Sequence, residues 1–258
     1  MRVAFLGSGS SGNATAIESD GAVVLVDAGF SARETLRRLA LAGMSAEKVR
    51  AVLVTHEHAD HASGIRVLAG RLKVPVYATA GTVAAAGIDA CVADPRRVKA
   101  GDTFSVASMR IHAFALSHDA VEPVGYRIEG ACGTAFGIAT DTGVLTCDAH
   151  EALTACDVLA LECNHDEDML RNGPYPWFLK QRILSSVGHL SNHSACRSIE
   201  RLLSGRLETI VGMHLSQQNN DAELVRDCLT DMLRREDHPA TVKVASQNAG
   251  LVLAFGER

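Results

Sequence analysis

The segment from His56 to His61 constrains this chain more than any other. It reads His-Glu-His-Ala-Asp-His, so three imidazoles and one aspartate fall within six positions. Four such groups packed together repel one another or lack hydrogen-bond partners unless a cation lies among them. Imidazole nitrogen and carboxylate oxygen are the usual ligands of zinc and of metals with similar preferences. The segment therefore predicts a metal site.

An apolar stretch leads directly into these ligands. Val49–Val54 is rich in β-branched residues, which is typical of a buried strand. The ligands are therefore expected where a strand opens into a loop, a common place for chemistry. With 11 histidines in 258 residues, chance alone rarely produces this pattern, so a metal site is favoured over a polar loop.

The composition indicates a cytoplasmic globular protein. At 258 residues and 47% hydrophobic, the chain can bury a large core, and no linker divides it, so we expect one domain over residues 1–258. The formal net charge of −5 gives no general attraction to nucleic acid. The seven cysteines are scattered and odd in number, which suits reduced thiols. No apolar run is long enough for a signal peptide or a membrane span.

Short apolar strands alternate with amphipathic helices along the chain. Hydrophobic periodicity predicts roughly twelve strands and five helices. Sheets covered by helices accommodate such a pattern, so the expected fold class is α/β or α+β.

One glycine-rich segment imitates a different fold. Gly7–Gly12 matches the pattern of a dinucleotide-binding loop after a strand, and Asp27 follows where an acidic residue would bind ribose. That loop requires a helix directly after the glycines, whereas Asn13–Glu18 alternates like a strand. Gly21 also comes too soon for a crossover helix. A hairpin with a flexible loop is predicted instead.

Four further residues could complete a metal centre, because each follows an apolar strand. They are Asp27, His118, Asp141 and His214. Each alone would more often be structural, as a helix cap for example. Together they repeat one arrangement, in which a strand delivers a ligand-capable side chain at its C-terminal end.

In this order the motifs resemble the five motifs of the metallo-β-lactamase superfamily, and the resemblance spans almost the whole chain. It implies an αβ/βα sandwich of two mixed sheets with helices outside and two divalent metal ions in a cleft at one edge. One metal would be bound by His56, His58 and His118, and the other by Asp60, His61 and His214. Asp141 would bridge the two metals, and Asp27 would orient their ligands from behind. Zinc, manganese and iron all accept this ligand set.

Local features narrow the type of bond that the protein is expected to cleave. The motif has histidine at its first two ligand positions. An oxygen-reducing di-iron branch of the superfamily has a glutamate-containing variant of the motif instead, so the histidines indicate hydrolysis. In related transfer-RNA 3′-processing nucleases, a glutamate and a histidine form a proton relay. Glu162 and His189 resemble that pair, with His193 as the competing histidine. The alternative to a relay is that Glu162 is an ordinary surface acid and that His189 belongs to the capped start of a helix.

Four segments resemble the YycJ/WalJ group of bacterial cytoplasmic proteins, which are regarded as 5′-to-3′ DNA exonucleases. The segments are Leu6–Asn13, Asn172–Pro176 with Leu179–Ile183, Gly188–Asn192 and His214–Asn220. The resemblance implies a metal-dependent phosphodiesterase acting on DNA, with RNA as a second candidate substrate. A hydroxide activated by the two metals would attack phosphorus, Asp60 could take a proton, and Glu162 with His189 would protonate the leaving oxygen. Asn13, Asn192 and Ser216 are expected to contact the substrate.

Two other functions remain open from the sequence. A thioesterase resembling glyoxalase II needs the metals but has no use for a Glu162–His189 relay. A non-catalytic nucleic-acid-binding protein could use the same ligands as a structural metal site. The role of the aromatic residues is also open, because Tyr175 or Trp177 could stack on a base or anchor a loop in the core.

Overall fold

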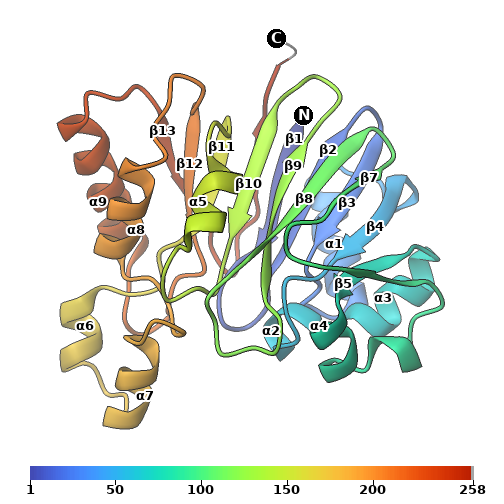
Figure 1. Ribbon diagram of the computed structural model, residues 1–258, viewed down its shortest axis with the longest axis horizontal. Coiled ribbons are helices and arrows are strands. Elements are labelled where there is room, and N and C mark those ends of the chain that lie inside the picture. Colours follow the sequence, from blue (N-terminus) through green and yellow to red (C-terminus); the bar gives the residue numbers. More distant parts are fainter. Residues whose placement is uncertain (257–258) are drawn as a thin grey trace.

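Two seven-stranded sheets face each other in the computed structural model, which describes residues 1–256 (Figure 1). The first sheet has the order β14 (Leu251–Ala254), β1 (Arg2–Gly7), β2 (Ala14–Ser19), β3 (Ala22–Val26), β4 (Val49–Leu53), β5 (Val76–Thr79), β6 (Pro95–Val98). The second has the order β13 (Thr241–Val244), β12 (Thr209–Met213), β11 (Val158–Glu162), β10 (Ala135–Ala139), β9 (Val124–Glu129), β8 (Met109–Ala115), β7 (Thr103–Val106).

Helices cover the outer face of each sheet. The first sheet is covered by α1 (Ala32–Leu41), α3 (Ile65–Leu72) and α4 (Ala80–Ala85). The second is covered by α5 (Cys147–Leu153), α8 (Asn192–Glu200) and α9 (Ala222–Arg235). The predicted αβ/βα sandwich is therefore confirmed.

Strand β3 shows why the central strands have continuous apolar sequences. All five of its residues are buried. Val24 and Val26 point into the core between the two sheets. Val23 and Leu25 point outward and pack under the helices. Because successive side chains alternate between faces and both faces are covered, no position along such a strand favours a polar residue.

The parallel strands bring the loops of interest to one edge of the sandwich. Strands β3 to β6 pair in parallel, and so do β10 to β13. Their carboxyl ends carry the connections that contain α2 (Ala59–Ala62), α6 (Glu167–Asn172) and α7 (Trp177–Ile183), seen in the lower part of Figure 1. The strand-end residues of both sheets consequently meet at this edge.

The glycine-rich segment forms the predicted hairpin. Strands β1 and β2, on either side of Gly7–Gly12, pair antiparallel. The roughly twelve predicted strands did not include β6 and β7, and the five predicted helices did not include the short helices α2, α4, α5 and α6. Edge strand β6 has two adjacent exposed arginines, Arg96 and Arg97, so it lacks the strict alternation by which half-buried strands are recognised. Among the described residues, no helix combines the length and apolar character needed to cross a membrane.

Candidate metal centre

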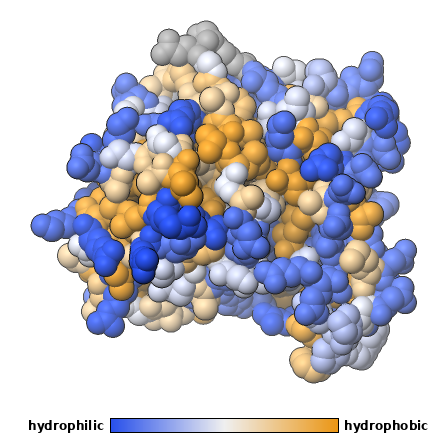
Figure 2. Space-filling view, turned by 180° about the vertical axis from the view of Figure 1, so that it is seen from behind, coloured by the Kyte–Doolittle hydropathy of each residue, from blue (hydrophilic) through white to orange (hydrophobic). Residues whose placement is uncertain are grey.

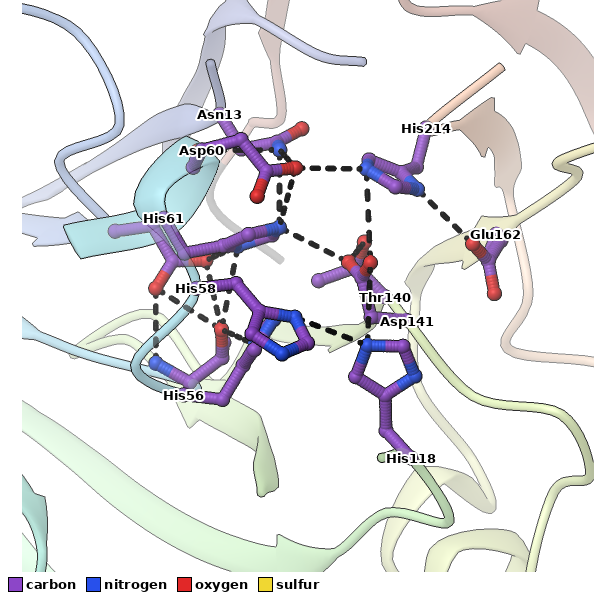
Figure 3. A network of polar contacts seen from close by, with 12 residues as sticks. Asn13, His56, His58, Asp60, His61, His118, Thr140, Asp141, Glu162 and His214 are labelled. Atoms are coloured by element: carbon purple, nitrogen blue, oxygen red, sulfur yellow. Dashed lines mark hydrogen bonds and ion pairs between the residues drawn. The ribbon is translucent and has the colours of Figure 1, made fainter. Parts of the chain in front are cut away.

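Three predicted site residues share an unusual backbone conformation just after a strand. Asp27 follows β3 with φ of 64°, and His214 follows β12 with φ of 55°. Asp141 lies just beyond β10 with φ of 55°. The left-handed region is uncommon for residues other than glycine, although aspartate and histidine enter it more readily than most. The side chains of Asp141 and His214 point toward one another and toward the histidines of the His56–His61 segment (Figure 3).

The first cluster contains three histidines from two distant segments. The ring centroid of His56 lies 4.7 Å from that of His58 and 5.2 Å from that of His118. The ligand nitrogens of all three lie within 4.8 Å of one another. Burial lowers the pKa of His56 and of His118, which favours the neutral imidazole that binds metals. His56 Nε2 is buried and has no hydrogen-bond partner among the described residues, so the cluster fits a cation.

The second cluster combines two carboxylates with two histidines, and its members are Asp60, His61, Asp141 and His214. His61 Nε2 lies 3.0 Å from Asp141 Oδ2, and His214 Nε2 lies 3.4 Å from Asp60 Oδ2. Burial alone would lower the pKa of His214, but Asp141, Asp60 and Glu162 raise it to about 10. The acidic groups thus favour positive charge at this point, and a metal ion would supply it in place of protons.

Asp141 lies between the two clusters. Its Oδ1 lies 3.8 Å from His118 Nε2 of the first cluster and 3.6 Å from His214 Nε2 of the second, while its Oδ2 faces His61. Burial would raise the pKa of this carboxyl, but His214 and His61 hold it well below its usual range. A carboxylate that lies within 4 Å of histidine nitrogens of both clusters has the position expected of a bridging ligand.

Asp27 lies behind the second cluster. One of its oxygens accepts a hydrogen bond from the Thr55 amide at 2.8 Å, and the other lies 2.8 Å from His61 Nδ1. A carboxylate can only accept, so it keeps the proton of the neutral imidazole on Nδ1 and leaves Nε2 of His61 for a metal. This contact agrees with the orienting role predicted for Asp27.

We expect Asp27→Asn to weaken metal binding by about 10–100-fold. The amide nitrogen of asparagine can donate to His61 Nδ1, which would favour the tautomer whose Nε2 carries a proton and cannot bind a metal. Titration of the purified variant with zinc or manganese measures the effect. Asp20→Asn is a matched control, because Asp20 is exposed and also has positive φ. Equal affinity in the two variants would contradict the orienting role.

Glu162 and His189 meet beside the second cluster. Glu162 Oε1 lies 2.7 Å from His189 Nδ1 and 3.0 Å from His214 Nδ1. Burial would raise the pKa of Glu162, but His189 and His214 lower it to about 2. The competing histidine, His193, is exposed on α8 near Asp166 and Glu167. The structure therefore brings His189, and not His193, against Glu162.

The three residues predicted to contact substrate occupy different surroundings. Asn13 belongs to the centre itself, with its Nδ2 3.0 Å from His61 Nε2. Asn192 is buried and pairs with the Asn220 amide. Ser216 is also buried, and its hydroxyl accepts a hydrogen bond from the Asn219 amide. Substrate contacts from these residues stay predictions.

Two supporting threonines were not singled out from the sequence. Thr55 donates through its hydroxyl to Asp27, and Thr140 donates to Asp141 at 2.7 Å. Each threonine directly precedes a predicted ligand position. A hydroxyl residue between a strand and a ligand is therefore the sequence pattern that indicates such a supporting contact.

Adjoining clusters of nitrogen and oxygen donors with a carboxylate, Asp141, near both are typical of a binuclear metal site. Together with the sandwich fold, this centre defines a metal-dependent hydrolase. A family model described as a beta-lactamase superfamily domain matches residues 23–214. The chain belongs to the metallo-β-lactamase superfamily, as the motifs predicted.

Individual relatives span nearly the whole chain. Exodeoxyribonuclease WalJ of Streptococcus pneumoniae is 35% identical over 244 residues, which cover 92% of this chain and 90% of the relative. Exodeoxyribonuclease YycJ of Bacillus anthracis is 34% identical over 239 residues, with 92% and 90% covered. The metallo-β-lactamase fold protein YhfI from Bacillus subtilis superposes with a TM-score of 0.74 at 18% identity, covering 98% of this chain and 99% of that one.

Proposed function

We propose that this chain is a phosphodiesterase that degrades DNA from the 5′ end. The observation that carries the proposal is the hydrogen-bonded Glu162–His189 pair beside the two clusters. A phosphodiester of DNA releases an alkoxide, which leaves poorly unless it is protonated, and a positioned imidazole meets that need. Similarity to two proteins named exodeoxyribonucleases supports DNA as the substrate.

The donor set fits two divalent cations. One would be held by His56, His58 and His118, the other by Asp60, His61 and His214, with Asp141 shared. When bound, such a pair activates water for attack on phosphorus and stabilises the charge that develops there. We assign zinc, manganese or iron to these positions on the chemistry of the donors.

His189 would donate the proton to the leaving oxygen. Burial would lower the pKa of its ring, but Glu162 raises it above its usual value. Nδ1 is held by Glu162, and no described residue takes a hydrogen bond from Nε2, which leaves that atom for the substrate. Glu162 is fully buried and acts through His189 as a positioning residue. Asp60 is more exposed than the other carboxylates of the centre, so it could also exchange a proton with solvent.

His189→Ala is expected to lower DNA hydrolysis by about 100-fold or more. Bis(p-nitrophenyl) phosphate should be affected far less, because p-nitrophenolate leaves without being protonated. Steady-state kinetics on both substrates measure the contrast. His193→Ala, four residues along the chain, is the matched control and should retain activity on both. Equal losses on both substrates in His189→Ala would show that this histidine does not donate the proton.

The proposed function has a direct test. Metal-loaded protein is incubated with 5′-phosphorylated and 5′-hydroxyl DNA and RNA, single- and double-stranded, each labelled at the 3′ end. We expect progressive shortening of DNA from the 5′ end. Thioester turnover without any degradation of nucleic acid would favour the thioesterase. Metal binding without either activity would favour a structural metal site.

A further inference from the structure

Helix α7 exposes two adjacent aromatic side chains beside the proposed active site. Trp177 is 67% exposed and Phe178 is 73% exposed. The other aromatic side chains of residues 1–256 are buried or half-buried. Helices α6 and α7 project from the body in Figure 1, and hydrophobic residues reach the surface at the corresponding lower right corner of Figure 2. Trp177 therefore does not anchor its loop in the core, and we call Trp177 and Phe178 the aromatic platform.

The aromatic platform is joined to the centre by a short exposed apolar path. Leu184 and Val187 lie between α7 and His189 in the sequence, and both are exposed. The His189 amide donates to the Ile183 carbonyl at 2.9 Å, which ties the end of α7 to the proposed proton donor. The Val187 carbonyl accepts a hydrogen bond from the amide of Asp119, the neighbour of His118. These contacts hold the end of α7 against the segment that carries His189 and against the residue next to His118.

The spacing suits a strand of nucleic acid. From Trp177 to Ile183 the helix axis covers about 9 Å, at about 1.5 Å per residue. Stacked nucleotides rise about 3.4 Å each, so this span corresponds to two or three nucleotides. A strand that runs along α7 from the His189 segment would therefore place two or three nucleotides beside the helix.

The charges around the platform favour stacking over ionic binding. Arg182 is paired with Asp119, and Arg171 is paired with Glu167. Lys180 is buried, with its ammonium group on the Arg171 carbonyl. With no free basic cluster among these residues, the surface does not suit an anionic membrane. Aromatic rings can hold unpaired bases without such a cluster, because every base has a flat face.

We propose that the aromatic platform binds unpaired bases of a single-stranded DNA end and holds that strand in line with the centre. The inference rests on the proposed function and adds to it the form of the substrate. Bases within a duplex are already stacked on one another, so their faces are closed to Trp177 and Phe178. A single-stranded end should therefore be bound more tightly than a blunt duplex.

Intrinsic fluorescence tests the platform directly, because Trp177 is the only tryptophan of the chain. Metal-loaded protein is titrated with a short phosphorothioate oligothymidine and with an abasic oligomer of equal length. We expect quenching by the oligothymidine and little by the abasic oligomer. The Trp177→Ala, Phe178→Ala double variant should bind oligothymidine roughly tenfold more weakly for each ring removed, measured by anisotropy of a labelled strand. The dependence of its affinity on salt should stay as in the wild type, because no phosphate contact is lost.

Control variants separate the platform from the chemistry. Leu41→Ala removes an equally exposed apolar side chain, 74% exposed on α1, and should change nothing. Trp177→Phe should restore most of the affinity lost in Trp177→Ala. The double variant should turn over bis(p-nitrophenyl) phosphate at the wild-type rate, because that substrate is too small to reach α7.

Three results would overturn the platform. One is DNA degradation by the double variant with the wild-type KM. Another is equal quenching by the abasic oligomer. The third is a change in Trp177 fluorescence that depends on protein concentration or on added phospholipid vesicles but not on DNA. Failure of the proposed function is seen separately, since the wild-type protein would then leave all DNA intact.

Discussion

Asp141→Asn is expected to lower hydrolysis by about a thousandfold or more, which corresponds to about 4 kcal/mol of transition-state stabilisation. Asp141 lies within 4 Å of ligand nitrogens of both clusters, His118 of the first and His61 of the second. An amide of the same size keeps the packing but removes the negative charge that two neighbouring cations would share. Turnover of DNA and of bis(p-nitrophenyl) phosphate should fall together, because both depend on the metals.

Thermal unfolding provides a second measurement of the same change. A ligand that binds only the folded state raises its stability, so the wild-type melting temperature should rise with added zinc or manganese. The rise should be much smaller in Asp141→Asn. Asp148→Asn, an exposed change on α5, serves as the control and should behave as the wild type. A full metal-dependent rise in Asp141→Asn would contradict the bridging role.

Gly29→Ala is expected to destabilise the fold by more than about 4 kcal/mol or to prevent folding. A Cβ at Gly29 would lie 1.7 Å from the Asp60 carbonyl oxygen and 2.4 Å from its carbon. The obstacle is backbone and is held in place, because that carbonyl accepts a hydrogen bond from the Asn13 amide at 2.7 Å. The Gly29 amide in turn donates to the Asn13 carbonyl. Displacing this contact would move α2, which carries Asp60 and His61.

Chemical denaturation measures the effect of Gly29→Ala, and Gly70→Ala is its control. Gly70 lies in α3, and no atom lies within 4 Å of a Cβ placed there. Alanine is preferred in a helix by about 1 kcal/mol, so this variant should be as stable as the wild type or slightly more stable. A Gly29→Ala protein with the wild-type unfolding midpoint would show that the loop at Asp60 can shift freely.

The candidate metal ligands could be picked out from the sequence because they depend on local features. A strand is recognised from its own apolar residues, and the ligand-capable side chain follows it directly, as at Asp27 and His214. The supporting contacts were harder to predict. Asn13 reaches His61 from the hairpin between β1 and β2, and no pattern within either segment indicates the other.

The choice between His189 and His193 illustrates the same limit. His189 lies just before α8 and His193 lies in its first turn, four positions later. From the sequence, either histidine could therefore take part in a relay. His189 meets Glu162 because the end of β11 lies beside the segment that enters α8, as the bridge between His165 and Ser191 shows. Trp177 was ambiguous for a related reason, since exposure depends on what the rest of the chain covers.

By itself, the sequence determined the sandwich class and the order of the candidate ligands, because strand periodicity and donor identity are local properties. Only the tertiary structure decided that Asp141 lies between two clusters, which histidine contacts Glu162, and that Trp177 and Phe178 face solvent. These outcomes depend on distances between segments far apart in the chain. Such distances arise when two sheets pack together, and no single segment carries them.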